Sequence, residues 1–283
     1  MDMTQEAETS RTDGGGKVVL ITGASSGIGQ TCAEYLAQRG MTVYGTSRGL
    51  QNSDMGAYHT LRMDVTDDAS VRHGVQQIHQ RHGRIDVAIN CAGYGIAGAV
   101  EETDPQEAIA QFNTNFFGVH RVCRAVLPMM RQSRSGVIIN ISSLAGLLAV
   151  PFQAFYSASK FAMEGMTEAL RMEVRPFGIR VALIEPGDFK SEFPSNRVNT
   201  ADSLKSGVYR ELLERCVGVM REEEKNGKAP VPVARLAERI INDPSPRLRY
   251  TVGPFGERLG PKLKSILPHR IYEYLFMKHY KLA

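Results

Sequence analysis

The sequence predicts an α/β fold: a doubly wound parallel sheet of about seven strands, flanked by helices and followed by a C-terminal helical extension. Two observations lead to this prediction. Short runs of almost entirely apolar residues alternate with longer stretches whose apolar residues recur at helical spacing. The first apolar run stops at a glycine-rich turn, which is typical of a strand that is buried on both faces and leads into a helix.

The elements follow one another in a regular order. The apolar runs predict strands at 17–22, 42–47, 59–63, 85–89, 137–141, 179–184 and 249–252. Helical spacing predicts helices at 28–40, 69–82, 105–131, 155–175, 207–225 and 232–241. Because helices separate most successive strands, the connections favour parallel pairing within a single sheet.

Composition limits the classes of function. The chain has 283 residues, 42% of them hydrophobic and 23% charged, which predicts a folded globular protein. Its net charge of +4 is scattered along the chain, so we expect no nucleic-acid partner. His73, His79 and His82 have no further ligands nearby, and we expect no metal site. The four cysteines form no close pair, which favours reduced thiols and a cytoplasmic location.

One domain is predicted, because no break in composition marks a boundary. We expect a disordered tail at 1–16, a main domain at 17–253 with a substrate-covering insert at 188–245, and an amphipathic extension at 254–283. Residues 263–282 mix apolar and basic side chains and predict a basic amphipathic helix. That helix would pack on its own domain, on a second subunit, or peripherally on a membrane. The acidic run at 222–225 is expected to be a solvated helix end.

The glycine-rich turn Gly23-Ala-Ser-Ser-Gly27-Ile-Gly29 lies between the first strand and the first helix. Glycines here let the backbone approach a pyrophosphate, whose charge the helix N-terminus stabilises. The turn predicts a dinucleotide site, although its spacing differs from the commoner G-x-G-x-x-G pattern. The second strand ends at Ser47 and Arg48, where an NAD-binding protein usually has an acidic side chain. A guanidinium binds the 2′-phosphate that a carboxylate would repel, so NADP(H) is expected over NAD(H).

Tyr156 and Lys160 lie four residues apart at the start of a predicted helix and share one face. A free phenol has a pKa of about 10, and a cation about 4 Å away supplies the roughly 4 kcal/mol that brings this pKa towards neutrality. Ser143 precedes Tyr156 by thirteen residues, at the end of a predicted strand, where its hydroxyl can polarise a carbonyl. Tyr274 and Lys278 repeat the spacing, but they have no serine at the corresponding position, and Tyr274 is expected to pack.

Together these motifs resemble the short-chain dehydrogenase/reductase family, over residues 17 to 191 and more weakly to 252, and in particular its hydroxysteroid and retinol dehydrogenase branch. The resemblance implies a Rossmann-type fold and a catalytic set. In that set Asn115 holds a relay water, Ser143 holds the substrate oxygen, Tyr156 passes the proton, and Lys160 lowers the tyrosine pKa and binds the nicotinamide ribose. Cys91 departs from the family's Asn-Asn-Ala-Gly motif. The implied cofactor contacts are Gly23, Ser25, Ser26, Gly27, Ile28, Gly29, Arg48, Asp64, Val65, Asn90, Ala92, Gly93, Tyr156, Lys160, Pro186, Gly187 and Ser191.

The implied activity is that of an NADP(H)-dependent oxidoreductase, which transfers a hydride between nicotinamide and a carbonyl or secondary alcohol. We expect a lipophilic substrate, similar to a steroid or a retinoid. A 3-oxoacyl thioester reductase is the alternative enzyme, and an NADP-sensing regulator without turnover is the alternative class. The resemblance also implies a homodimer, or a tetramer, formed through the helices at 105–131 and 155–175. The side chains expected to line the substrate pocket are Tyr94, Ser143, Val150, Phe152, Phe189 and Phe193.

Overall fold

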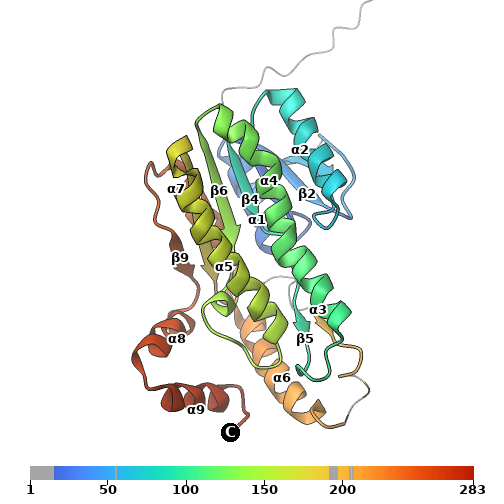
Figure 1. Ribbon diagram of the computed structural model, residues 1–283, viewed down its shortest axis with the longest axis vertical. Helices are drawn as coiled ribbons and strands as arrows, with labels where there is room; N and C mark the ends of the chain where they lie inside the picture. Colours follow the sequence, from blue (N-terminus) through green and yellow to red (C-terminus); the bar gives the residue numbers. More distant parts are fainter. Residues whose placement is uncertain (1–15, 55, 191–196, 204, 206) are drawn as a thin grey trace, which may run out of the picture.

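The computed structural model describes residues 16–54, 56–190, 197–203, 205 and 207–283 (Figure 1). The tail predicted at 1–16 lies outside the described residues, apart from Gly16. Ser191 and Phe193, which were expected to contact cofactor and substrate, also lie outside them.

A seven-stranded sheet forms the centre of the molecule. Its strands are β1 (Val18–Thr22), β2 (Thr42–Ser47), β3 (His59–Arg62), β4 (Val87–Asn90), β6 (Gly136–Ile141), β7 (Ile179–Pro186) and β9 (Arg249–Val252). They lie in the order β3-β2-β1-β4-β6-β7-β9, and every neighbouring pair is parallel. β1, β4 and β6 are buried along their whole length, as their apolar runs predict. The predicted fold class is confirmed.

Helices cover both faces of this sheet (Figure 1). One face packs against α1 (Gly27–Gln38) and α7 (Val231–Asn242). The opposite face packs against α2 (Asp68–His82), α4 (Gly118–Gln132) and α5 (Ala154–Val174). Alternate residues of each central strand point to opposite faces, so every strand contributes to both layers of the core.

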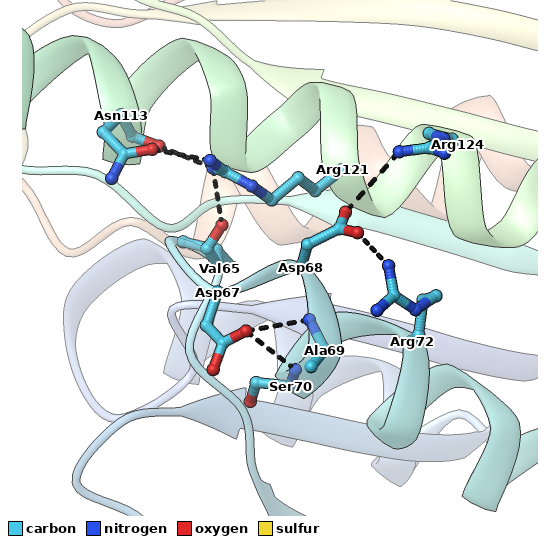
Figure 2. Close-up of polar contacts among 9 residues, drawn as sticks. All are labelled: Val65, Asp67, Asp68, Ala69, Ser70, Arg72, Asn113, Arg121 and Arg124. Atoms are coloured by element: carbon cyan, nitrogen blue, oxygen red, sulfur yellow. Dashed lines mark hydrogen bonds and ion pairs between the residues drawn. The ribbon is translucent and has the colours of Figure 1, made fainter.

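The helix predicted at 105–131 is in fact two helices. A π-helical turn at Asn113–Phe117 joins α3 (Pro105–Phe112) to α4. Arg121 of α4 stabilises the turn, because its guanidinium donates to the Asn113 carbonyl oxygen at 3.2 Å and to the Asn113 Oδ1 at 2.8 Å. The same guanidinium donates to the Val65 carbonyl at 3.2 Å, which joins the turn to the loop after β3 (Figure 2). Such turns are frequent at functional sites.

The C-terminal extension also forms two helices, α8 (Phe255–Ile266) and α9 (His269–His279). The single helix predicted at 263–282 is therefore wrong. Pro268 disfavours a helical conformation at the residue before it, and Leu267 is extended, with φ −79° and ψ 146°. Helix α8 ends at this point, and α9 begins in a new direction.

Helix α9 packs on its own protein, which is one of the alternatives that the sequence left open. Phe276 and Tyr280 join a buried cluster with residues of α6 (Arg210–Asn226), whereas Tyr274, which was expected to pack, is exposed. The strands β5 (Ile96–Ala97) and β8 (Val198–Asn199) form a separate short sheet. Figure 1 shows α6, α8 and α9 at the end of the main sheet towards which its strands run. Across the described ranges, no helix has the length and apolar character that spanning a membrane requires.

Candidate active site

The predicted cofactor residues gather at the carboxyl ends of the parallel strands. The glycine-rich turn follows β1, Arg48 follows β2, Asp64 and Val65 follow β3, and Ala92 and Gly93 follow β4. The strand order reverses direction between β1 and β4, which lie side by side. In open α/β sheets, ligands bind in the crevice at such a reversal. The fold therefore places the predicted nucleotide residues where this architecture binds ligands.

The glycine-rich turn has the geometry that an anion site needs. Gly23 and Gly27 have φ angles of +69° and +55°, which favour glycine. A Cβ atom at Gly29 would lie 2.2 Å from the Gly23 carbonyl oxygen, so this position requires glycine as well. Within the described chain, no side chain caps the N-terminus of α1 and no acidic residue lies in its first turn. The backbone N–H groups of this helix end suit a pyrophosphate, and the residues present fit a dinucleotide cofactor.

Three residues of the expected cofactor set have contacts or electrostatic effects within the protein. Arg48 is exposed, and its charge lowers the pKa of Tyr94, which burial raises by a larger amount. Asp64 Oδ1 accepts hydrogen bonds from the Thr66 amide at 2.8 Å and the Thr66 hydroxyl at 2.7 Å, which fixes the loop after β3. Asn90 donates to Asn140 Oδ1 at 2.8 Å and so links β4 to β6.

Ser143, Tyr156 and Lys160 lie together at the end of β6 and the start of α5. The Ser143 hydroxyl forms a hydrogen bond with the Tyr156 phenol, and it also accepts from the Ala145 amide at 3.1 Å. Lys160 follows one helical turn later, with its Nζ 5.8 Å from the centroid of the Tyr156 ring. This Nζ donates to the Ile141 carbonyl oxygen at 2.9 Å. The structure thus brings the three side chains together, as their spacing predicts.

The protonation equilibria of these groups differ from the expectation. Burial lowers the pKa of Lys160 to about 8. Burial also raises the pKa of Tyr156 to about 12, against the opposing effect of the Ser143 hydrogen bond, and Asp188 raises it further. The predicted lowering of the phenol pKa by Lys160 is therefore corrected: desolvation of the phenol outweighs the contacts that lower its pKa, and the Lys160 ammonium donates to the Ile141 carbonyl. At neutral pH the phenol keeps its proton.

Asn115 is fully buried in the π-helical turn and holds the backbone of Tyr94. Its Oδ1 accepts from the Tyr94 amide at 3.1 Å, and its Nδ2 donates to the Tyr94 carbonyl at 2.9 Å. The same Nδ2 donates to Ser159 Oγ at 3.2 Å, and that hydroxyl donates to the Tyr156 carbonyl at 2.7 Å. The side chain therefore connects the loop after β4 to the helix that carries Tyr156. Its implied role at a relay water stays a prediction.

A cavity of about 630 Å³ opens beside Ser143 and Tyr156. Of the expected substrate-lining residues, Ser143, Val150 and Phe189 line it, and so do Ile28, Pro186 and Gly187 from the expected cofactor set. Much of the remaining wall comes from α6, α8 and α9, so the extension covers part of the site. Apolar side chains on this wall are Met220, Leu263, Leu267, Leu275, Phe276 and Tyr280.

Two expected lining residues do not belong to this cavity as the described residues form it. Phe152 has a φ angle of +58°, and its ring packs edge-on against Tyr209 with the ring centroids 6.5 Å apart. The backbone of Tyr94 is held by Asn115, and its side chain is within electrostatic reach of Arg48. These contacts depend on tertiary packing and do not follow from sequence position.

Sequence reasoning missed the polar side chains of the cavity. They are Gln153, Asp188, Arg197, Glu223, Glu224, Glu257 and His279. The run at 222–225 was expected to be solvated, but Glu224 is buried and Glu223 faces the cavity. Asp188 directly follows Pro186-Gly187, which were expected to contact the cofactor. This position could have indicated that Asp188 lies at the site. Glu257 and His279 come from the extension, whose packing the sequence did not predict.

Comparisons with known proteins identify the family. Residues 17–202 match the short chain dehydrogenase family. A 3-ketodihydrosphingosine reductase from Bacteroides thetaiotaomicron is 44% identical over 266 residues, which cover 94% of this chain and 98% of the relative. Retinol dehydrogenase 8 from Bos taurus is 35% identical and covers 82% of this chain and 80% of its own.

Solved structures extend the comparison. The crystal structure of a short-chain dehydrogenase from Streptomyces avermitilis is 31% identical, with a TM-score of 0.78, and covers 95% of this chain and 98% of its own. Other similar structures are complexes with NADP, and one is a complex with NAD.

Proposed function

The chain belongs to the short-chain dehydrogenase/reductase family, and from this premise we propose that it uses NADPH to reduce the ketone of a long-chain lipid of the 3-ketodihydrosphingosine type. The family makes the chain an oxidoreductase that uses a nicotinamide cofactor. The choice of substrate rests on the cavity and on the relative that shares 44% of its residues with this chain.

One observation carries the proposal: the cavity is lined by two kinds of surface. The hydroxyls of Ser143 and Tyr156 lie near polar side chains that act on the pKa of the phenol. Leu263, Leu275 and Phe276 of the C-terminal helices add an apolar wall. An amphiphile with a ketone near its polar head and a long hydrocarbon chain matches both kinds of surface. Burial of the chain against that wall would supply most of the binding free energy, at about 25 cal/mol per Å².

The residues of the site suit reduction. NADPH, when bound at the glycine-rich turn, supplies the hydride. Ser143 and Tyr156 would hold the ketone oxygen between their hydroxyls, and Tyr156 would donate its phenolic proton to that oxygen. A pKa of about 12 keeps this proton in place at neutral pH until charge develops on the oxygen. Lys160, whose pKa is about 8, is mostly protonated at neutral pH and would orient the nicotinamide ribose.

The preference for NADPH over NADH is part of the proposal. Arg48 is exposed directly after β2, and its guanidinium would pair with a 2′-phosphate there. Ser47, at the end of β2, provides no carboxylate to bind an unphosphorylated ribose. The NADP complexes among the similar structures support the same preference.

A steroid- or retinoid-like substrate is the second candidate, and the similarity to retinol dehydrogenase 8 favours it. The experiment is a panel of 3-ketodihydrosphingosine, a steroid ketone, a retinoid and a 3-oxoacyl thioester, each with NADPH and with NADH. We expect the largest kcat/KM for 3-ketodihydrosphingosine with NADPH. A larger value for a steroid, a retinoid or the thioester would replace the proposed substrate. Tight NADPH binding without turnover of any carbonyl would indicate a regulator.

The assembly and location are proposed on separate grounds. We propose a homodimer through α4 and α5, because Phe117 and Phe161 expose apolar surface beside these helices. We propose peripheral contact of the extension with a membrane, because Ile266 and Ile271 are exposed near Lys262 and Arg270, where a lipid substrate would enter. Four free cysteines favour a cytoplasmic location.

A further inference from the structure

Four carboxylates line the cavity. We call Asp188, Glu223, Glu224 and Glu257 the carboxylate cluster. They come from three elements: Asp188 follows β7, Glu223 and Glu224 lie in the last turns of α6, and Glu257 lies in the first turn of α8. Acidic side chains at the C-terminal end of a helix are unfavourable because of the helix dipole. The cluster therefore is not explained by the stability of α6.

The fold itself brings these side chains together. β7 and β9 are parallel, with Pro186 opposite Val252, so the residues after both strands emerge side by side. As a result, the Asp188 amide donates to Glu257 Oε2 at 2.7 Å. Phe189 forms an isolated parallel bridge with Lys228, which brings the end of α6 to the same place.

Positive charge at the cavity does not balance the cluster. Among the described residues that line the cavity, four carboxylates face one guanidinium, that of Arg197, and one imidazole, that of His279. Arg197 forms an ion pair with Glu224 Oε1. His279 Nε2 lies 3.2 Å from Glu223 Oε1, and its hydrogen bond to Glu223 raises its pKa. Even with His279 protonated, the cavity wall keeps an excess of negative charge.

Two buried polar atoms of cavity-lining residues have no partner within the described part of the chain. Gln153 is 5% exposed, lines the cavity, and its Nε2 has no hydrogen-bond partner. Glu224 is also 5% exposed, and its Oε2 lacks a partner although Oε1 is paired. Leaving such atoms unsatisfied costs stability, which a folded protein tolerates chiefly at functional sites. Both atoms suit the polar head group of a ligand. Gln153 Nε2 can donate to an oxygen, and Glu224 Oε2 can accept from a cation.

The electrostatics point to a cation. Burial raises the pKa of Asp188 to about 7, and the negative charges of Glu257, Glu224 and Glu223 add to this effect. Asp188 and Glu224 also raise the pKa of Tyr156, so both lie within electrostatic reach of the catalytic phenol. A bound positive charge would relieve the repulsion. A metal ion is disfavoured, since no described group of His, Cys, Asp and Glu side chains has the arrangement of a metal site.

We propose that the carboxylate cluster, chiefly Asp188 and Glu224, binds the protonated amine of a substrate whose amino group is on the carbon next to the ketone. This inference rests on the proposed function and deepens it: the enzyme selects 2-amino-3-ketones over other long-chain ketones. Ser143 and Tyr156 fix the ketone oxygen, so an ammonium group one carbon away lies beside the phenol, where the charges of Asp188 and Glu224 act. Gln153 Nε2 is then available to donate to an oxygen of the same head group.

The experiment compares two substrates of equal chain length, with the full chain and NADPH. One is 3-ketodihydrosphingosine, and the other is the 1-hydroxy-3-ketone that lacks its amino group. The test variant is Asp188→Asn, which removes the charge and keeps the shape. The control is Glu222→Gln, which removes a charge from the exposed side of the same acidic run. We expect Asp188→Asn to lower kcat/KM for the amino ketone about ten- to hundredfold, and to change kcat/KM for the amine-free ketone about threefold or less. Glu222→Gln should change neither.

Each outcome has one reading. If Asp188→Asn lowers both substrates equally, or lowers neither, the cluster does not bind the amine. If the wild-type protein reduces both ketones equally well, this inference fails and the proposed function stands. If it reduces neither, the proposed function fails. Folding is checked by thermal denaturation at pH 8, where removal of the Asp188 charge should leave Tm unchanged or higher, because a raised carboxyl pKa means that this charge destabilises the folded state. If Asp188→Asn has a lower Tm, Glu224→Gln replaces it, and kcat/KM for the amino ketone is again compared with kcat/KM for the amine-free ketone.

Discussion

Replacement of Lys160 by methionine should separate catalysis from stability. Lys160 is buried, and its ammonium donates to the Ile141 carbonyl. Methionine fills a similar volume without the charge. We expect Lys160→Met to lose activity about a hundredfold or more, because the cation that orients the cofactor and supports proton transfer is gone. We also expect the variant to unfold no more easily than the wild-type protein at pH 7.

The expected change in the free energy of unfolding follows from the pKa of Lys160. Burial lowers the Lys160 pKa from 10.5 to about 8, and this difference corresponds to about 3 kcal/mol of free energy spent on burying the charge. The lost hydrogen bond to Ile141 leaves a carbonyl without this partner, which costs about 1–3 kcal/mol. The two terms oppose each other, so the free energy of unfolding at pH 7 should be unchanged or higher by up to about 2 kcal/mol in the variant.

The sign of the pH dependence provides the test. Between pH 8 and pH 10.5 the unfolded chain keeps the Lys160 proton while the folded protein releases it, so the wild-type protein gains stability from this group as pH rises. The variant has no such gain. Urea denaturation is measured at pH 7 and at pH 10. Any excess in the free energy of unfolding of Lys160→Met over the wild-type protein should be smaller at pH 10. The control is Lys278→Met, in the exposed second Tyr-x-x-x-Lys match, which should keep both activity and stability. The reasoning would be refuted if Lys160→Met were less stable than the wild-type protein at pH 7 and the difference in their free energies of unfolding were the same at pH 10.

Two further predictions concern the cofactor and the hydrocarbon chain. Arg48→Gln should raise the KM for NADPH about tenfold and leave the KM for NADH unchanged, because only NADPH carries the 2′-phosphate. Equal effects on both KM values would show that Arg48 does not bind the 2′-phosphate. Phe276→Ala opens the apolar wall of the cavity beside Tyr272 and Tyr280. It should lower kcat/KM about tenfold for a long-chain ketone and much less for a short-chain one. An equal loss of kcat/KM for every substrate in a chain-length series would contradict the proposed apolar wall.

The sequence could predict the parts of the site that local rules determine. Four-residue spacing on a helix places Tyr156 and Lys160 on one face, and the end of a buried strand places Ser143 beside them. Likewise, glycines between β1 and α1 predict a nucleotide turn, which the positive φ angles at Gly23 and Gly27 fit. The fold class followed from the same kind of pattern, because burial on both faces leaves uninterrupted apolar runs.

Properties that depend on tertiary packing could not be predicted in this way. Asp188 and Glu257 are 69 residues apart, and only the parallel pairing of β7 with β9 makes them neighbours. The raised pKa of Tyr156 depends on how completely α5 and the C-terminal helices exclude water, which spacing alone does not measure. Phe152 has a positive φ angle and packs against Tyr209, 57 residues later in the chain, and nothing at position 152 in the sequence indicates either feature.

The most direct test of the central claim is the Tyr156→Phe variant, measured for ketone reduction with NADPH and for NADPH affinity by fluorescence titration. The phenolic hydroxyl is the only group lost, and it forms a hydrogen bond with Ser143, which also lines the cavity. The account predicts a loss of kcat by about a hundredfold to ten-thousandfold, with NADPH affinity within about threefold of the wild-type value. Turnover close to that of the wild-type protein would contradict it.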